Sequence, residues 1–370
     1  MPQLKDTLPM GQSIWLDHID RSFMAAGRLQ ALIDDGLRGL TSNPSIFEKA
    51  IGDGDAYDGP LRQLVDQDTS IMQIYETLVI SDIQQAADLL RPVYDNSDGR
   101  DGFVSLEASP DVAYDTQATL TQVRNLFDKV DRPNVMIKVP ATAAGIPAIA
   151  TLIGEGINVN VTLMFSQTHY DAVADAYIRG LERLAANDGD LAGVASVASF
   201  FVSRVDTAVD TRLQALDDKR VPVLLGKAGI ANARLVYTRY LNRFCGERWQ
   251  RLAARGARPQ RILFGSTSVK NPDYPELMYV EALMGSNTVN TLPPATIRAF
   301  QQHGRVTADL TSDLEVARRE LNEIAALGID LEAITQQLQD DGVDQFAEAY
   351  EDLLQSIADK CERFEARQPA

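Results

Sequence analysis

The sequence has few of the residues that build disulfides and metal sites. Among its 370 residues are two cysteines and three histidines. Two cysteines cannot make a disulfide framework or a thiolate metal site, so a reducing cytoplasm is the expected location. The histidines are scattered, and no two of them have the spacing of a ligand pair. We therefore expect neither a metal nor any other cofactor.

Basic charge and long apolar runs are also scarce. The chain has 35 Lys and Arg against 52 Asp and Glu, a formal charge of −17, and such acidity would repel a nucleic acid. It has no run of about 18 apolar residues that could span a membrane, and its first residues lack the apolar core of a secretory signal. We expect no nucleic-acid or membrane partner, and either a monomer or a homodimer. A small anionic substrate could still bind where a few basic side chains gather in one cleft.

The remaining composition is that of a globular protein, with 45% hydrophobic and 24% charged residues. Short β-rich segments alternate with amphipathic helical ones, which is typical of a parallel sheet. Eight repeats favour an α/β fold of the closed (β/α)8 TIM-barrel type over an open sheet. The expected strands are 13–17, 39–42, 103–107, 134–139, 157–163, 194–201, 261–266 and 288–292.

Helical patterns occupy most of the remaining chain. We expect single helices over 20–35, 166–184 and 230–252, and two or three helices between strands 2 and 3, over 45–100. After residue 296 only helices are expected, at 312–326, 331–338 and 344–364. We predict one domain, 1–370, in which 13–296 form the barrel and 297–370 form helices packed on its exterior.

Polar residues occur where barrel strands are normally apolar, near the carboxyl ends that face the active site in this fold. Lys138 is the most informative, because it lies between apolar neighbours in Val135–Pro140 and lysine is seldom buried without a purpose. Desolvation can lower the pKa of a lysine by up to about 3–5 units and free its amine to attack a carbonyl. The alternative is a lysine that reaches solvent or pairs with Glu107.

The other polar residues suggest supporting roles. Asp17 and Glu107 could exchange protons, or could instead form an ion pair or a helix cap. Thr162 could hold a water molecule, while Asn43, Asn160 and Ser199 could bind substrate hydroxyls or simply hydrogen-bond to backbone. A cluster of Arg204, Ser268 and Lys270 could bind a phosphate, unless Arg204 pairs with Asp206 at the surface. Phe201 could line the pocket.

Three motifs carry a family resemblance: Leu40–Phe47 (LTSNPSIF), Ile137–Thr142 (IKVPAT) and Asn160–Ser166 (NVTLMFS). Together they closely resemble the signatures of the transaldolases. The resemblance implies a metal-free barrel of the pentose phosphate pathway that works through a lysine Schiff base. Such an enzyme moves a dihydroxyacetone unit from sedoheptulose 7-phosphate to glyceraldehyde 3-phosphate, giving erythrose 4-phosphate and fructose 6-phosphate.

The resemblance also implies a role for each matching residue. Lys138 is the Schiff-base lysine, and Asp17 takes the proton from the C4 hydroxyl during cleavage. Glu107 and Thr162 hold the catalytic water. The implied substrate contacts are Asn43, Asn160 and Ser199 for the dihydroxyacetone hydroxyls, Phe201 for the pocket wall, and Arg204, Ser268 and Lys270 for the phosphate.

The sequence departs from the family pattern at two positions. Lys270 stands where many relatives have arginine, so a bidentate grip on phosphate becomes a point charge. No proline separates Ser199 from the aromatic ring of Phe201, which could reshape the pocket wall. The helical tail and the 45–100 insert resemble the longer branch of the family.

Two other functions compete with transfer. A fructose-6-phosphate aldolase shares the lysine, but such enzymes usually have a shorter chain and another acid/base arrangement, so Asp17 and Glu107 favour transfer. A non-catalytic barrel that binds sugar phosphates would be expected to have an interrupted site. Every position named above is instead filled by a residue competent for the chemistry.

Overall fold

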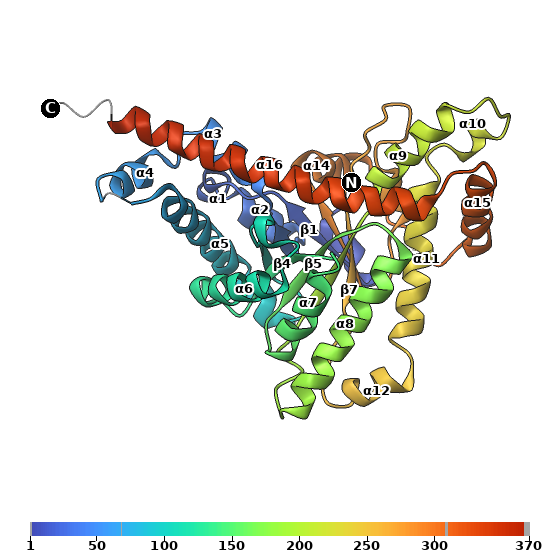
Figure 1. The fold of residues 1–370 in the computed structure, drawn as a ribbon, viewed down its shortest axis with the longest axis horizontal. Coiled ribbons are helices and arrows are strands. Elements are labelled where there is room, and N and C mark those ends of the chain that lie inside the picture. Colours follow the sequence, from blue (N-terminus) through green and yellow to red (C-terminus); the bar gives the residue numbers. More distant parts are fainter. Residues whose placement is uncertain (1, 68, 308–309, 366–370) are drawn as a thin grey trace.

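The computed structural model describes residues 2–67, 69–307 and 310–365, and its centre is a closed barrel of eight parallel strands (Figure 1). The strands follow one another round the barrel in chain order, and β8 pairs with β1. This confirms the predicted (β/α)8 barrel, and every predicted strand overlaps an observed one. The strands are β1 Gln12–Asp17, β2 Gly39–Thr41, β3 Phe103–Glu107, β4 Val135–Pro140, β5 Val159–Met164, β6 Ser196–Phe201, β7 Arg261–Gly265 and β8 Thr288–Leu292.

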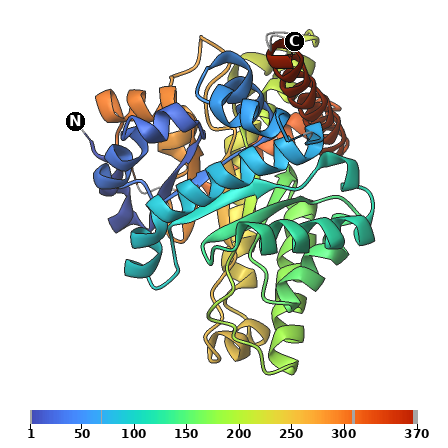
Figure 2. The same cartoon turned by 90° about the vertical axis from the view of Figure 1, so that its left-hand side faces the viewer.

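Helices connect the strands and surround the barrel (Figures 1 and 2). The predicted insert between strands 2 and 3 contains α3, α4 and α5. The predicted tail contains α15, α16 and most of α14, and α14 matches none of the predicted helices. Residues 68, 308–309 and 366–370 of the predicted insert and tail lie outside the described residues. The helices are α1 Arg21–Ala25, α2 Arg28–Asp35, α3 Pro44–Asp53, α4 Asp58–Val65, α5 Ile71–Asn96, α6 Thr116–Val130, α7 Gly145–Gly154, α8 Gln167–Ala186, α9 Ser203–Gln214, α10 Val221–Leu224, α11 Ala228–Arg243, α12 Glu247–Ala253, α13 Met278–Ala282, α14 Pro294–His303, α15 Leu314–Ala326 and α16 Leu331–Glu365, with 3-10 turns η1 Leu4–Met10 and η2 Pro110–Val112.

Two helices predicted to be continuous are broken at glycines. The segment 20–35 is divided into α1 and α2 by Gly27, which adopts the left-handed conformation with φ of 70°. A non-glycine residue reaches that conformation only at a cost. The segment 230–252 is divided by an extended residue, Gly246, that precedes α12. Hydrophobic periodicity continues across both breaks and therefore did not reveal them.

The opposite error occurred in the tail, where the predicted helices 331–338 and 344–364 form the single helix α16. Asp340, Asp341 and Gly342 lie between the two predicted segments, and all three have low helix propensity. Here a glycine is useful for packing, because a Cβ atom at Gly342 would lie 2.8 Å from Cδ2 of Leu163 on β5. Close packing against the barrel therefore outweighs a weak local preference.

The amino-terminal end of the barrel is closed by its own side chains. Six of the eight barrel strands contribute one side chain each to an apolar layer. The layer consists of Trp15, Phe103, Met136, Val197, Leu263 and Val289. Beside it Arg261 forms a buried ion pair with Asp101, at 2.7 Å between Nη2 and Oδ1. Both groups also hydrogen-bond to Ser13. Leu263 of this layer also lines a cavity at the carboxyl end, whereas Phe103, Met136 and Val197 line a smaller cavity of about 360 Å³ at the amino-terminal end.

Helix α16 lies across that carboxyl end, running from α15 past α9 to α3 and α4 (Figure 1). Its Gln339 donates hydrogen bonds from Nε2 to the carbonyl oxygens of Ala141 and Leu163, at 3.1 and 2.9 Å. Ala141 directly follows β4, and Leu163 is the last residue but one of β5. The helix thus lies outside the ring of strands and covers the mouth of the barrel. The division into a 13–296 barrel and 297–370 exterior helices stays a prediction. None of the helices in the described ranges is both long and apolar enough for a membrane span.

Candidate active site

A cavity of about 670 Å³ lies at the carboxyl end of the barrel, between the strand ends, α9 and α16. All but two of the predicted site residues line it. These are Asp17, Asn43, Lys138, Thr162, Ser199, Phe201, Arg204, Ser268 and Lys270. The two others, Glu107 and Asn160, are buried directly behind this lining and hydrogen-bond to it. The convergence expected from the barrel topology is therefore present.

Lys138 is buried, with a side chain that is 7% exposed. Its register on β4 pairs it with Glu107 on β3 and with Asn160 on β5. The amine donates hydrogen bonds from Nζ to Glu107 Oε2 at 2.9 Å and to the Ser42 carbonyl at 3.0 Å. The lysine does not reach bulk solvent, and the ion pair with Glu107 does form. Burial raises the pKa of Glu107, and the charge of Lys138 opposes that rise.

Helix α16 adds an aromatic ring beside this amine. The ring centroid of Phe346 lies 5.6 Å from Nζ of Lys138. The same ring lines the cavity, and so do Leu338, Asp341 and Gln345 of α16. Sequence reasoning missed all four of these residues. The only available signal was the helical stride that includes Phe346, and this stride indicates a buried helix face without saying what that face covers.

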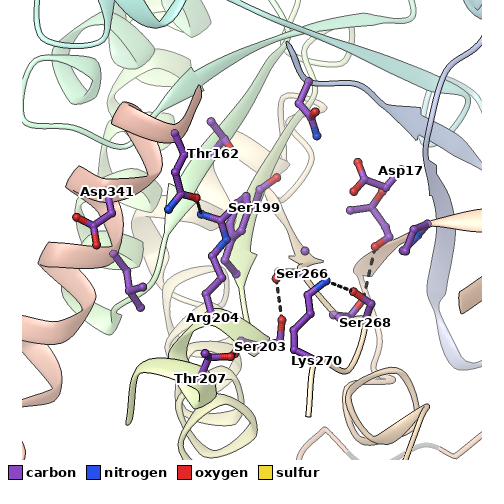
Figure 3. Close-up of a pocket in the computed structure, with 18 of the residues that line it drawn as sticks. Asp17, Thr162, Ser199, Ser203, Arg204, Thr207, Ser266, Ser268, Lys270 and Asp341 are labelled. Atoms are coloured by element: carbon purple, nitrogen blue, oxygen red, sulfur yellow. Dashed lines mark hydrogen bonds between the residues drawn. The ribbon is translucent and has the colours of Figure 1, made fainter. Parts of the chain in front are cut away.

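Asp17 ends β1 at the rim of the cavity (Figure 3). Its Oδ1 accepts a hydrogen bond of 2.8 Å from the hydroxyl of Thr41, which lies 2.8 Å from the hydroxyl of Thr291. Asp17 does not cap a helix, because Asp20 is the N-cap of α1. Burial raises the pKa of Asp17 while Lys138 lowers it. A carboxyl group with a raised pKa is suited to both accepting and returning a proton near neutral pH.

Thr162 has a buried hydroxyl that finds no hydrogen-bond partner among the described residues. A buried polar group of this kind normally bonds to protein or to water. Thr162 lies on β5, opposite Pro140 of β4 and close to Lys138. Next to it Leu163 has a left-handed φ of 58°, where the pairing of β5 with β6 shifts register. The hydroxyl is therefore available to a water molecule in the cavity.

The three residues expected to bind substrate hydroxyls differ in their environment. Asn160 is fully engaged: Nδ2 donates to the Ser105 hydroxyl at 3.0 Å, and Oδ1 accepts from Ser199 at 2.6 Å. It does not line the cavity, so its direct contact with substrate stays a prediction. Asn43 lines the cavity but also caps α3 by accepting from the Ile46 N–H at 3.0 Å. Ser199 lines the cavity and rests on Asn160.

Besides Lys138 and Arg212, which also line the cavity, Arg204 and Lys270 face it from different elements (Figure 3). Arg204 lies in the first turn of α9, and Lys270 follows β7 and donates to the Ser268 hydroxyl at 2.9 Å. Neither cation takes part in an ion pair within the described part of the chain. The surface pair of Arg204 with Asp206 does not form, because Asp206 is buried and accepts hydrogen bonds from Gly229 N–H and Tyr279 O–H. In a chain of charge −17, two cations without a carboxylate partner favour an anion.

Comparison with known proteins agrees with this geometry. A family described as "Transaldolase/Fructose-6-phosphate aldolase" matches residues 14–357. A transaldolase of Thiobacillus denitrificans is 48% identical over 354 residues, covering 95% of this chain and 99% of the relative. A transaldolase of Thermobifida fusca is 46% identical, with 97% of each chain covered. Transaldolase 1 of Streptomyces avermitilis is 47% identical over 94% of this chain and 93% of its own length. The chain therefore belongs to the transaldolase/fructose-6-phosphate aldolase family.

Proposed function

We propose that this protein is a transaldolase that moves a dihydroxyacetone unit from sedoheptulose 7-phosphate to glyceraldehyde 3-phosphate, as part of the pentose phosphate pathway. The observation that carries the proposal is the buried amine of Lys138. It lies 2.9 Å from Glu107 Oε2, at a cavity that also contains Arg204 and Lys270. A ketose phosphate offers a carbonyl for the amine and a phosphate for the cations.

The first step joins Lys138 to the ketose. The ammonium group gives a proton to Glu107, and the neutral amine adds to the C2 carbonyl; the surplus proton on nitrogen then moves to the oxygen. Glu107 returns its proton to that oxygen, which leaves as water, and an iminium ion remains on the lysine. Glu107 is adjacent to Nζ, and the unpartnered hydroxyl of Thr162 can hold the water that leaves and later returns. These two residues thus serve the formation and hydrolysis of the Schiff base.

The second step breaks the bond between C3 and C4. Asp17 takes the proton of the C4 hydroxyl, C4 becomes an aldehyde, and the electron pair of the broken bond moves to the iminium to form an enamine. The aldose product leaves, and an acceptor aldehyde takes its place. The enamine then attacks that aldehyde, and Asp17 returns its proton to the new hydroxyl. The hydrogen bond from Thr41 keeps Oδ1 of Asp17 in place for both transfers.

Binding residues hold the two ends of the substrate. Arg204, Ser268 and Lys270 bind the phosphate, with Lys270 as a point charge rather than a bidentate partner. Asn43 and Ser199 contact the dihydroxyacetone hydroxyls, and Phe201 lines the wall. Asn160 supports Ser199 from behind, at 2.6 Å.

Transfer requires that the enamine survive until the acceptor arrives. An aldolase would instead protonate the enamine and release free dihydroxyacetone. The ring of Phe346 lies 5.6 Å from Nζ on the side of α16, and it limits the approach of water to the reacting carbon. We therefore place transfer ahead of simple cleavage. The reaction needs no metal, and we propose that the enzyme works in the cytoplasm as a monomer or a homodimer.

Borohydride trapping tests the Schiff base directly. Incubation with fructose 6-phosphate and borohydride, followed by mass spectrometry of peptides, should give a reduced adduct on Lys138. The Lys138→Met variant, which keeps the length of the side chain, should give none while its circular dichroism spectrum stays that of the wild type. The absence of an adduct on Lys138 in the wild type would support the non-catalytic sugar-phosphate-binding barrel instead.

A second assay separates transfer from aldol cleavage. Fructose 6-phosphate is supplied alone and then with erythrose 4-phosphate, and both free dihydroxyacetone and sedoheptulose 7-phosphate are measured. We expect sedoheptulose 7-phosphate to form only with the acceptor, and little dihydroxyacetone without it. Rapid release of dihydroxyacetone in the absence of an acceptor would identify an aldolase.

A further inference from the structure

The guanidinium group of Arg204 is oriented by neutral partners. Its Nη1 donates a hydrogen bond of 2.9 Å to Oε1 of Gln345 on α16, and its Cζ lies 5.7 Å from the ring centroid of Phe201. The side chain is half-buried, and burial lowers the pKa of Arg204. A guanidinium group nevertheless keeps its proton at neutral pH. The arginine therefore presents an undiminished charge to the cavity.

The position of Gln345 is set by the anchoring of α16 on the barrel. One turn and two turns earlier on the same helix, Gly342 packs against Leu163 and Gln339 bonds to two carbonyl oxygens at the strand ends. One residue later, Phe346 reaches the amine of Lys138. Gln345 thus extends from a helix that is anchored on the strand ends and also packs against α9. A hydrogen bond from such an element can select one rotamer of a long side chain.

We propose that Gln345 is a positioning residue for substrate phosphate: it orients Arg204 through Oε1 and leaves the arginine charge free for the anion. This inference rests on the proposed role of Arg204 in binding phosphate. An amide oxygen accepts a hydrogen bond without supplying a formal charge. A glutamate at the same position would orient the guanidinium equally well, but it would neutralise the charge and repel a phosphate. The residue type at 345 thus sets affinity for the phosphorylated end of the substrate.

Two variants at this position separate orientation from charge. Gln345→Ala removes the hydrogen bond, and we expect the KM for fructose 6-phosphate to rise about 3- to 10-fold, the scale of one lost hydrogen bond. Gln345→Glu adds a carboxylate, and we expect a larger rise of about 10- to 100-fold. The value of kcat should change less than about 2-fold in both, because neither variant touches the reacting atoms. Unphosphorylated fructose should be used equally well by all forms.

Matched controls come from the same helix. Gln355 is exposed on α16, lies outside the cavity and donates to Asp359 at 2.7 Å. Gln355→Ala and Gln355→Glu make the same chemical changes away from the site, and both should leave KM unchanged. A KM that rises equally in the Gln345 and Gln355 variants would mean a general effect on the helix and would overturn the inference. An unchanged KM in both Gln345 variants would overturn it as well.

Binding of inorganic phosphate tests the inference without catalysis. Isothermal titration should show weaker binding in Gln345→Ala, still weaker binding in Gln345→Glu, and wild-type binding in both Gln355 variants. Arg204→Ala should weaken binding at least as much as Gln345→Ala. If wild-type protein fails to form the Schiff base but shows this order of phosphate affinities, the proposed function fails and the role of Gln345 stands. If transfer is normal but both Gln345 variants bind phosphate as tightly as the wild type, the proposed function stands and the proposed role of Gln345 fails.

Discussion

Asp17 and Glu107 both lie close enough to Lys138 for its charge to influence their protonation. Burial raises the pKa of Asp17 and of Glu107, whereas the positive charge of Lys138 lowers both. The charge of this shared lysine thus offsets part of the cost of burying two carboxyl groups at one barrel end. Proton transfer between Lys138 and Glu107 then needs little rearrangement, because their hydrogen bond already exists in the free protein.

Replacement of Asp17 tests the assignment of the acid/base role. Asp17→Asn keeps the shape and an acceptor for the Thr41 hydroxyl, but it cannot take a proton from the C4 hydroxyl. We expect kcat to fall about 10²- to 10⁴-fold, while borohydride still traps the Schiff base on Lys138. The control Asp34→Asn changes an exposed carboxylate of α2 and should leave kcat as it is. Normal turnover of Asp17→Asn would assign the proton transfer to another group.

At the scale of elements, α9 combines a rim residue with a buried anchor. Arg204 faces the cavity, whereas Asp206 on the same helix is 1% exposed and ties α9 to α11 and α13. The Asp206 oxygens accept hydrogen bonds from Gly229 N–H at 2.7 Å and from Tyr279 O–H at 2.8 Å. Burial raises the pKa of Asp206 to about 6; Asp210 adds to the rise, and Lys227 opposes it. The contacts that hold α9 against α11 and α13 are therefore made by a carboxyl group, Asp206, that changes its protonation in a mildly acidic range of pH.

This titration predicts how stability depends on pH. The folded protein holds the proton of Asp206 up to a pH of about 6, whereas an unfolded chain releases it near 3.8. The stabilisation from this group is therefore complete below pH 3.8 and is lost as pH rises to about 6. The loss amounts to about 3 kcal/mol, and nothing further is lost above that range. Asp206→Asn removes the titration but keeps an acceptor for Gly229.

Chemical denaturation of both proteins at several pH values measures the effect. The free energy of unfolding of the wild type, relative to Asp206→Asn, should decrease by about 2 kcal/mol between pH 4 and pH 6, because titration is only partly complete at either end of this range. Using the difference between the two proteins cancels the other titrating groups. A difference that stays constant over this range would show that the Asp206 pKa is close to its ordinary value.

At the scale of the whole molecule, the two ends of the barrel have separate tasks. The carboxyl end is polar and contains the cavity beneath α16. The amino-terminal end contains the apolar layer and the buried pair of Arg261 with Asp101. Loops and helices at the carboxyl end of this fold carry function, whereas the opposite end carries stability. A substitution at one end should therefore affect one property and leave the other unchanged.

Asp101→Ala tests this separation. It leaves Arg261 buried without its carboxylate, and we expect the free energy of unfolding to fall by about 3–5 kcal/mol. The value of kcat, measured at a temperature where the variant is folded, should stay within about 2-fold of wild type, because the pair lies at the end opposite the site. The control Asp88→Ala breaks an exposed pair with Arg132 and should cost at most about 1 kcal/mol. Comparable losses of stability in the two variants would contradict the proposed stabilising role of the pair.

Local patterns were sufficient for the barrel and for much of the site. Each strand is a short apolar run bounded by helical segments, so its position depends on neighbouring residues in the chain. The carboxyl ends of the parallel strands meet at one mouth of the barrel, so polar residues near several strand ends are expected to lie together there. This is how Lys138 and Asp17 could be named from the sequence. The catalytic and binding roles of these residues stay predictions until the variants are made.

Contacts between distant segments were decided by the tertiary structure alone. The continuity of α16 through Gly342 depends on Leu163, and Gln345 gains its significance only from its hydrogen bond to Arg204. The engagement of Asn160 with Ser105 and Ser199 is equally invisible in the sequence. Periodicity shows that a helix has a buried face, but the surface that covers this face is chosen by packing across the whole molecule. The sequence by itself thus determined the barrel and the place of Lys138 at its mouth, because both depend on short stretches of chain. Packing between distant segments decided which helix covers that mouth.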